Sequence, residues 1–135
     1  MSIPHERWCR LLFLVAAIYD LLLGVIFTFF YRWTFIQLGV EDALPEYEGL
    51  LVLIGAFLIV IGVAYVYIFR GELHRNVDLI AVGTLYKAAY FIVAFVFFML
   101  DGLPHPVFFW VFGVADLIFF VLMYRCWRMI SQHLD

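Results

Sequence analysis

Apolar residues fall in four long runs along the chain, and each run is interrupted by at most one charge. The runs cover residues 11–30, 50–69, 79–100 and 106–124. Each is roughly 20 residues long, and a helix of that length, at about 1.5 Å per residue, spans the ~30 Å hydrocarbon layer of a bilayer. Transmembrane strands would instead appear as segments of about ten residues with alternating polarity. The pattern therefore predicts four transmembrane helices.

Glycine, proline and charged residues between the runs set the expected helix boundaries. Gly39 is suited to ending a helix, and Gly71 has the same role after the second run. The stretch 32–40 is apolar enough to continue the first helix or to lie in the membrane interface. Because most connections are short, consecutive helices should run in opposite directions. The expected helices cover about 8–32, 47–70, 77–100 and 105–130.

The fold class that follows is an all-α membrane protein, an antiparallel four-transmembrane-helix bundle that forms a single domain over residues 1–135. Composition agrees, since the 135 residues are 67% hydrophobic and 14% charged and include 16 phenylalanines. A soluble domain of this size cannot bury so much apolar surface. The lipid bilayer is thus the first expected partner, and no nucleic-acid partner is predicted.

Arginine is distributed unevenly between the two ends of the predicted bundle. One end carries six arginines and the other carries Arg32 alone; the six are Arg7, Arg10, Arg70, Arg75, Arg125 and Arg128. Positive residues favour the cytoplasmic side of a membrane. We therefore expect a multi-pass protein of a bacterial cell inner membrane with both termini cytoplasmic, an N-in/C-in arrangement.

Two cysteines, Cys9 and Cys126, lie at the predicted cytoplasmic end of the first and last helices. The cytoplasm is reducing, which disfavours a structural disulfide. The sequence also lacks the C-x-x-C motif of thiol oxidoreductases. Both cysteines are expected to be free and unreactive.

Small residues indicate where the helices pack. Gly55 and Gly62 lie one heptad apart on the second helix, a spacing that permits close approach of a neighbouring backbone. Gly24, Gly83 and Gly113 each lie three or four residues from a charge within a span. Each of those charges therefore shares a helix face with a small residue, as expected if both face the bundle interior.

Three charged residues, Asp20, Lys87 and Asp116, interrupt otherwise apolar runs. Counting from the flanking polar residues puts all three at a similar depth, slightly to the cytoplasmic side of the membrane centre. A charge at that depth costs roughly 2.5–3.5 kcal/mol on insertion scales, so unpaired charges would be severely unfavourable. We expect the Lys87 ammonium to lie between the two carboxylates and to bring the first, third and fourth helices together.

Hydroxyl groups on the same helices are candidate partners for these charges. They belong to Tyr19, Tyr86, Tyr90, Thr28 and Thr84. Two carboxyl groups and one ammonium leave one carboxyl in excess, an arrangement that resembles a proton relay or a cation site in its physics. Two interpretations stay open: a polar clip that fixes helix order, or a binding site formed by Asp20, Lys87, Asp116, Tyr90, Tyr19 and Tyr86.

Motifs for familiar catalysis do not occur in the sequence. The four histidines lie in tails or loops and share no metal-ligand spacing, and phosphate loops and nucleophile elbows are missing. No catalytic residue, metal site or cofactor is therefore assigned, and an enzyme is not expected. The many phenylalanines in the spans suit either packing against lipid or a pocket for a flat lipophilic molecule, which leaves a quinone or a lipid as the ligand to consider.

Several of these features occur together in a known group. The run Ile18–Gly24, the later pair Tyr86 and Lys87, and the run Ala115–Ile118 before a basic tail resemble small four-helix bacterial inner-membrane proteins grouped as DoxX-like. That group includes subunits of quinone-linked oxidoreductases, so the resemblance implies an accessory or anchoring role. No functional residue is carried over from it.

The expected function is therefore a non-enzymatic accessory subunit or structural component of a membrane complex, with other membrane subunits or further copies of this chain as partners. The alternative is a bundle that binds a lipophilic, quinone-like ligand or handles protons or cations at the Asp20, Lys87 and Asp116 site.

Overall fold

Each apolar run forms one long helical segment in the computed structural model, which describes residues 5–134. All four segments are long and apolar enough to cross a membrane, and no strand occurs between residues 5 and 134. The helices in chain order are α1 Glu6–Phe29, α2 Tyr31–Gln37, the short 3-10 helix η1 Glu41–Ala43, α3 Gly49–Arg70, the 3-10 helix η2 Leu73–Asn76, α4 Val77–Met99, the π-helix η3 Phe108–Gly113 and α5 Val114–Gln132. The expected boundaries agree closely for α3 and α4.

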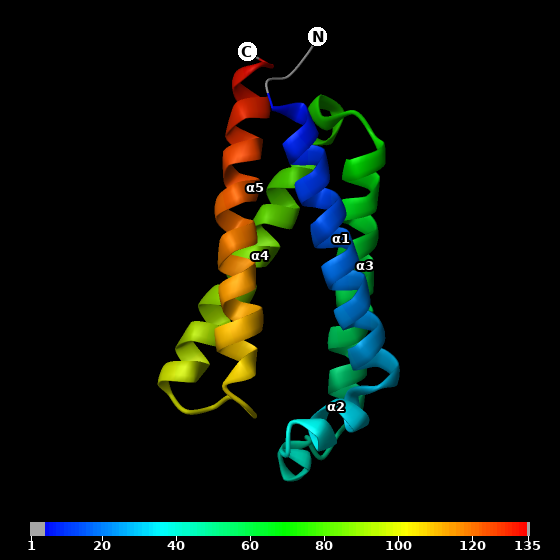
Figure 1. Cartoon of the computed structure of the whole chain (residues 1–135), viewed down its shortest axis with the longest axis vertical. Coiled ribbons are helices and arrows are strands. Elements are labelled where there is room, and N and C mark those ends of the chain that lie inside the picture. The colour runs from blue at the N-terminus through cyan, green and yellow to red at the C-terminus, as the bar shows by residue number, and fades with distance from the viewer. Residues whose placement is uncertain (1–4, 135) are drawn as a thin grey trace.

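The four long helices alternate in direction and form two pairs (Figure 1). Helix α1 packs along α3, and α4 packs along α5 with η3. The two pairs lie close together at the end that holds both termini and the α3–α4 connection, and they diverge toward the opposite end, where α2 lies. We call these the terminal end and the splayed end of the bundle.

Glycine allows the close contact between α1 and α3. A Cβ atom added to Gly55 would lie 2.6 Å from the backbone nitrogen of Thr28 and 2.9 Å from the carbonyl oxygen of Gly24. At Gly62 it would lie 2.7 Å from the side chain of Leu21. Such distances leave no room for a methyl group, so the predicted packing face of the second span is confirmed and its partner is the first span.

The first helix ends three residues earlier than expected. Phe30 departs from helical geometry with φ −128°, and α2 begins directly after it. Phe35 on α2 is almost completely buried, in contact with α1 and α3. Burying that ring on the bundle requires the chain to turn, which explains why the helix does not continue straight to residue 32.

A polar contact holds α2 against the start of α3. Arg32 donates to both carboxylate oxygens of Glu48 at 2.7 Å, and the Tyr31 hydroxyl donates to the same carboxylate at 3.1 Å. This hydrogen bond raises the pKa of the Tyr31 hydroxyl, because the neighbouring carboxylate disfavours a second negative charge. The contact therefore ties the two ends of the long connection between the first two spans to each other.

The expectation of two free cysteines is wrong. Cys9 on α1 and Cys126 on α5 form a disulfide, with Cα atoms 5.9 Å apart and both residues fully buried. The two cysteines can bond because the first and last helices lie side by side at the terminal end, a proximity that the redox compartment alone does not predict. Beside the disulfide, Arg10 donates to the carbonyl oxygens of Phe69 and Gly71 at 2.8 and 2.7 Å, which satisfies the C-terminus of α3.

The disulfide can be tested by counting thiols in unfolded protein. Without reductant, we expect a maleimide reagent to label neither cysteine, and after reduction to label two. Closing so long a loop stabilises a fold by about 2–4 kcal/mol, so Cys9→Ser should lower the thermal unfolding midpoint. Two thiols labelled without reductant would show that the pair is not bonded.

Candidate functional site

The centre of the bundle holds the predicted charge cluster. The Lys87 ammonium on α4 donates to Asp20 Oδ1 on α1 and to Asp116 Oδ1 on α5, both at 2.9 Å. Lys87 is fully buried, and Asp20 and Asp116 are 1% and 4% exposed. The hypothesis that one ammonium lies between two carboxylates is therefore confirmed as geometry. The cluster joins the α1–α3 pair to the α4–α5 pair.

Aromatic rings enclose the ammonium on its remaining sides. Its nitrogen lies 4.8 Å from the ring centre of Phe119 and 5.0 Å from that of Tyr19. The rings of Tyr86 and Tyr65 lie at 5.6 and 5.8 Å. A cation is attracted to an aromatic face at such distances, most strongly where water is excluded. The Lys87 ammonium is thus surrounded by two carboxylates and by aromatic rings rather than by water.

The predicted hydroxyl partners do not bond to the cluster. Tyr90 donates to the carbonyl oxygen of Phe108 at 3.2 Å, and Thr84 donates to the carbonyl oxygen of Ile80 at 2.7 Å. The hydroxyls of Tyr19 and Thr28 are buried and have no hydrogen-bond partner among residues 5–134. Tyrosines contribute to the cluster through their rings, because the Lys87 ammonium is already held by charged acceptors.

Two residues around the lysine were missed by the sequence reasoning. Tyr65 on α3 is fully buried and donates to the carbonyl oxygen of Gly83 at 2.7 Å, and its ring leaves no space for a side chain at Gly83. Phe119 on α5 follows Asp116 by three residues and so shares its helix face. Its spacing was visible in the sequence, whereas nothing local distinguishes Tyr65 from the other tyrosines.

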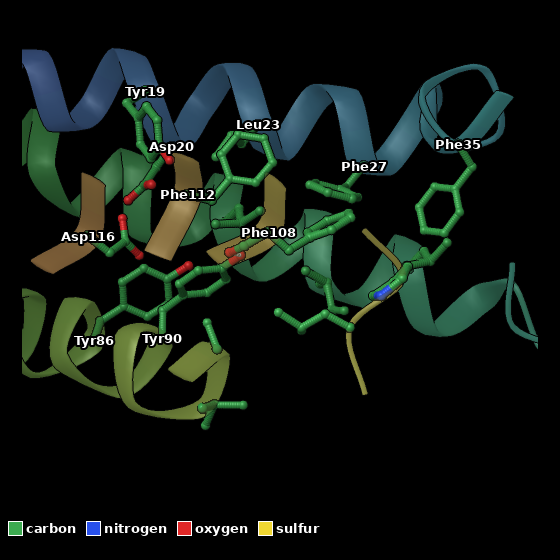
Figure 2. Close-up of a pocket in the computed structure, with 17 residues that line it drawn as sticks. Tyr19, Asp20, Leu23, Phe27, Phe35, Tyr86, Tyr90, Phe108, Phe112 and Asp116 are labelled. Carbon is green, nitrogen blue, oxygen red and sulfur yellow. Dashed lines mark hydrogen bonds between the residues drawn. The ribbon is translucent and has the colours of Figure 1, made fainter. Parts of the chain in front are cut away.

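A cavity of about 250 Å³ extends from the charge cluster toward the splayed end of the bundle (Figure 2). Asp20 and Asp116 lie at one end of the array of lining side chains, and Phe35 lies at the other. The lining comes from both helix pairs, and from α2 and the turn at Leu103 and Pro104. The cavity therefore lies between the two pairs, where they begin to diverge.

The chemistry of the lining differs along the cavity. Near the cluster it includes two carboxylates and the rings of Tyr19, Tyr86 and Tyr90, whereas the rest is aliphatic and aromatic. Lys87 itself is not a lining residue. A molecule in the cavity would thus have the two aspartates at its polar end, and the ammonium behind them.

A π-helix forms part of the cavity wall. The turn Phe108–Gly113 precedes α5, and both Phe108 and Phe112 line the cavity from it. Such wide turns are rare and occur frequently at functional sites. The predicted helix over 105–130 gave no indication of this change in winding, which alters the direction of the side chains before Asp116.

Comparison of the chain with protein-family models, with curated proteins and with solved structures finds no significant match.

Replacing the lysine should destabilise the fold. In Lys87→Met two buried carboxylates lose their shared counter-ion, a change that costs about 3–5 kcal/mol. We expect a clear fall in the thermal unfolding midpoint in detergent, and substantial recovery when Asp20→Asn and Asp116→Asn are added to remove the unpaired charges.

The matched control for this change is Arg75→Met. Arg75 pairs with Glu72 at 3.0 Å but is 77% exposed, and exposed pairs contribute about 0–1 kcal/mol. If Lys87→Met is as stable as Arg75→Met, the cluster does not support the fold.

Proposed function

We propose that this protein binds a lipophilic small molecule with a polar head group, inside the bundle and between its two helix pairs. The observation that carries the proposal is the cavity itself. It is predominantly apolar, but it ends on two carboxylates that the fold has taken out of water. Ligand pockets commonly combine an apolar lining with a few polar groups that orient the ligand.

The charge cluster supports a binding role beyond that of a polar clip. A clip alone needs only the contacts from Lys87 to Asp20 and Asp116. Here Asp20 Oδ2 and the Tyr19 hydroxyl are buried and find no partner within the described part of the chain. A buried polar group without a partner costs about 1–3 kcal/mol, a cost that a clip made only of the two Lys87 contacts does not require. A quinone and a lipid with a hydroxyl head group are both lipophilic molecules with a polar head group.

A multi-pass arrangement is supported by the four apolar helices, and we further propose a bacterial inner membrane with both termini cytoplasmic. Arg10, Arg70 and Arg125 illustrate the bias of arginine toward the terminal end. The disulfide lies at the same end, and its full burial limits access by soluble reductants. A fluorescent protein fused to the C-terminus should fold and fluoresce in the cytoplasm; a periplasmic C-terminus would contradict the orientation.

The role as accessory subunit, with other membrane subunits or further copies of the chain as partners, stays a prediction, as does the relationship to DoxX-like proteins. A ligand-binding bundle is compatible with either, because the cavity is formed within one chain. Lipid-facing surfaces of the four helices remain available for a partner.

A cavity-filling variant tests the proposed function. Leu23 lines the cavity, whereas its neighbour Leu22 is 60% exposed on the outside of α1. Protein purified from native membranes in lipid discs should carry a lipophilic molecule that mass spectrometry detects. Leu23→Trp should remove it, because the larger ring occupies the cavity, and Leu22→Trp should retain it. The same small molecules bound to both variants would contradict the proposal.

A further inference from the structure

The charge at the closed end of the cavity indicates which ligands it accepts. We propose that the cavity selects lipophilic organic cations, in which an ammonium group is attached to an apolar body. The inference rests on the proposed function and specifies the chemical class of its ligand.

The charge cluster contains one more negative group than positive. Asp20 and Asp116 supply two negative charges and Lys87 supplies one positive charge, so the cluster carries a formal charge of −1 when all three are ionised. The other ionisable groups that face it within residues 5–134 are the tyrosines Tyr19 on α1, Tyr65 on α3, and Tyr86 and Tyr90 on α4. Tyrosine is neutral near pH 7. The excess negative charge therefore needs either a proton or a cation.

The carboxylates lie nearer to the cavity than the ammonium does. The two carboxylates line the cavity, whereas the ammonium does not. Asp20 Oδ2 is buried below the cavity surface and has no hydrogen-bond partner among residues 5–134, so it acts on the cavity through its charge. An anionic head group entering the cavity would meet the carboxylates before it could approach Lys87. A cationic head group would approach two groups of opposite charge.

Aromatic rings form much of the cavity wall near the carboxylates. Tyr86, Tyr90 and Phe112 lie around the carboxylate end (Figure 2). Aromatic rings stabilise a desolvated cation, and aromatic cages are the usual recognition sites for quaternary ammonium groups. The protein already holds its own lysine in this manner, with Phe119 and Tyr19 within 5.0 Å of the ammonium. Aromatic rings also line the adjacent part of the cavity, where they can contact a bound cation.

The size of the cavity suits a compact head group with a short apolar body. A volume of about 250 Å³ accommodates a ring and a small ammonium group. Benzyltrimethylammonium is a suitable probe, because neopentylbenzene has the same shape with carbon in place of the charged nitrogen. Phenylmethanesulfonate provides an anion of similar size.

The test is a calorimetric titration of the full chain in lipid discs with each of the three probes, after subtraction of empty discs. We expect the cation to bind at least about tenfold more tightly than the neutral or anionic probe. Asp116→Asn should weaken the cation about tenfold and leave the neutral probe unchanged. The matched control is Asp101→Asn, on the exposed turn at the splayed end. This substitution should change neither the affinity for the cation nor that for the neutral probe.

A second measurement covers the case in which Asp116→Asn fails to fold. In the unmodified protein, lowering the pH supplies protons that compete with the cation for the same carboxylates. The affinity for benzyltrimethylammonium should therefore fall between pH 8 and pH 5, whereas that for neopentylbenzene should not.

Equal affinity for the cation and its neutral isostere would overturn the inference, and so would the failure of all three probes to bind. Either result leaves the proposed function to be decided separately, by whether Leu23→Trp removes the molecule that accompanies the protein from its native membrane.

Discussion

A single ammonium shared by two carboxylates is the interaction on which the rest of the structure depends. Lys87 is fully buried and bonds to Asp20 and Asp116 at 2.9 Å each. Three charges in an apolar bundle are tolerable only if they meet, and they meet only if α1, α4 and α5 converge at one level. This requirement fixes how the α1–α3 pair is placed against the α4–α5 pair, for which apolar packing alone is poorly directional.

The bundle is closed to different degrees along its length. At the terminal end the Cys9–Cys126 disulfide and the Arg10 contacts to the end of α3 hold the helices together. The charge cluster holds them at the centre. Beyond it the pairs diverge (Figure 1), and residues of both pairs line the cavity. The carboxylates therefore serve both as a link between the pairs and as the polar end of the cavity.

Much of this could be predicted from the sequence because a few physical rules dominate in apolar helices. Long runs give the spans, glycines such as Gly55 give the closest helix contact, and charges such as Lys87 must find partners. The disulfide was within reach, since both cysteines were placed at the same end of the first and last helices. A reducing compartment argues against the bond, whereas the proximity of the two helix ends favours it.

Other features depend on contacts that no local pattern encodes. The break at Phe30 accompanies the burial of Phe35, and the π-helix before Asp116 packs on α4. Tyr65 reaches the carbonyl of Gly83 across a helix interface. The cavity could not be derived either, because its volume depends on how far the two pairs diverge and on which rings point inward.

The most direct test of this account uses the fact that Lys87 is the chain's only lysine. Solid-state NMR of protein in lipid bilayers, labelled with ¹⁵N at the lysine side chain and ¹³C at aspartate carboxyl carbons, measures the distance between these groups. The account predicts one lysine nitrogen coupled to two carboxyl carbons at hydrogen-bonding range, and to one in Asp20→Asn. A lysine nitrogen with no carboxyl carbon in that range would contradict it.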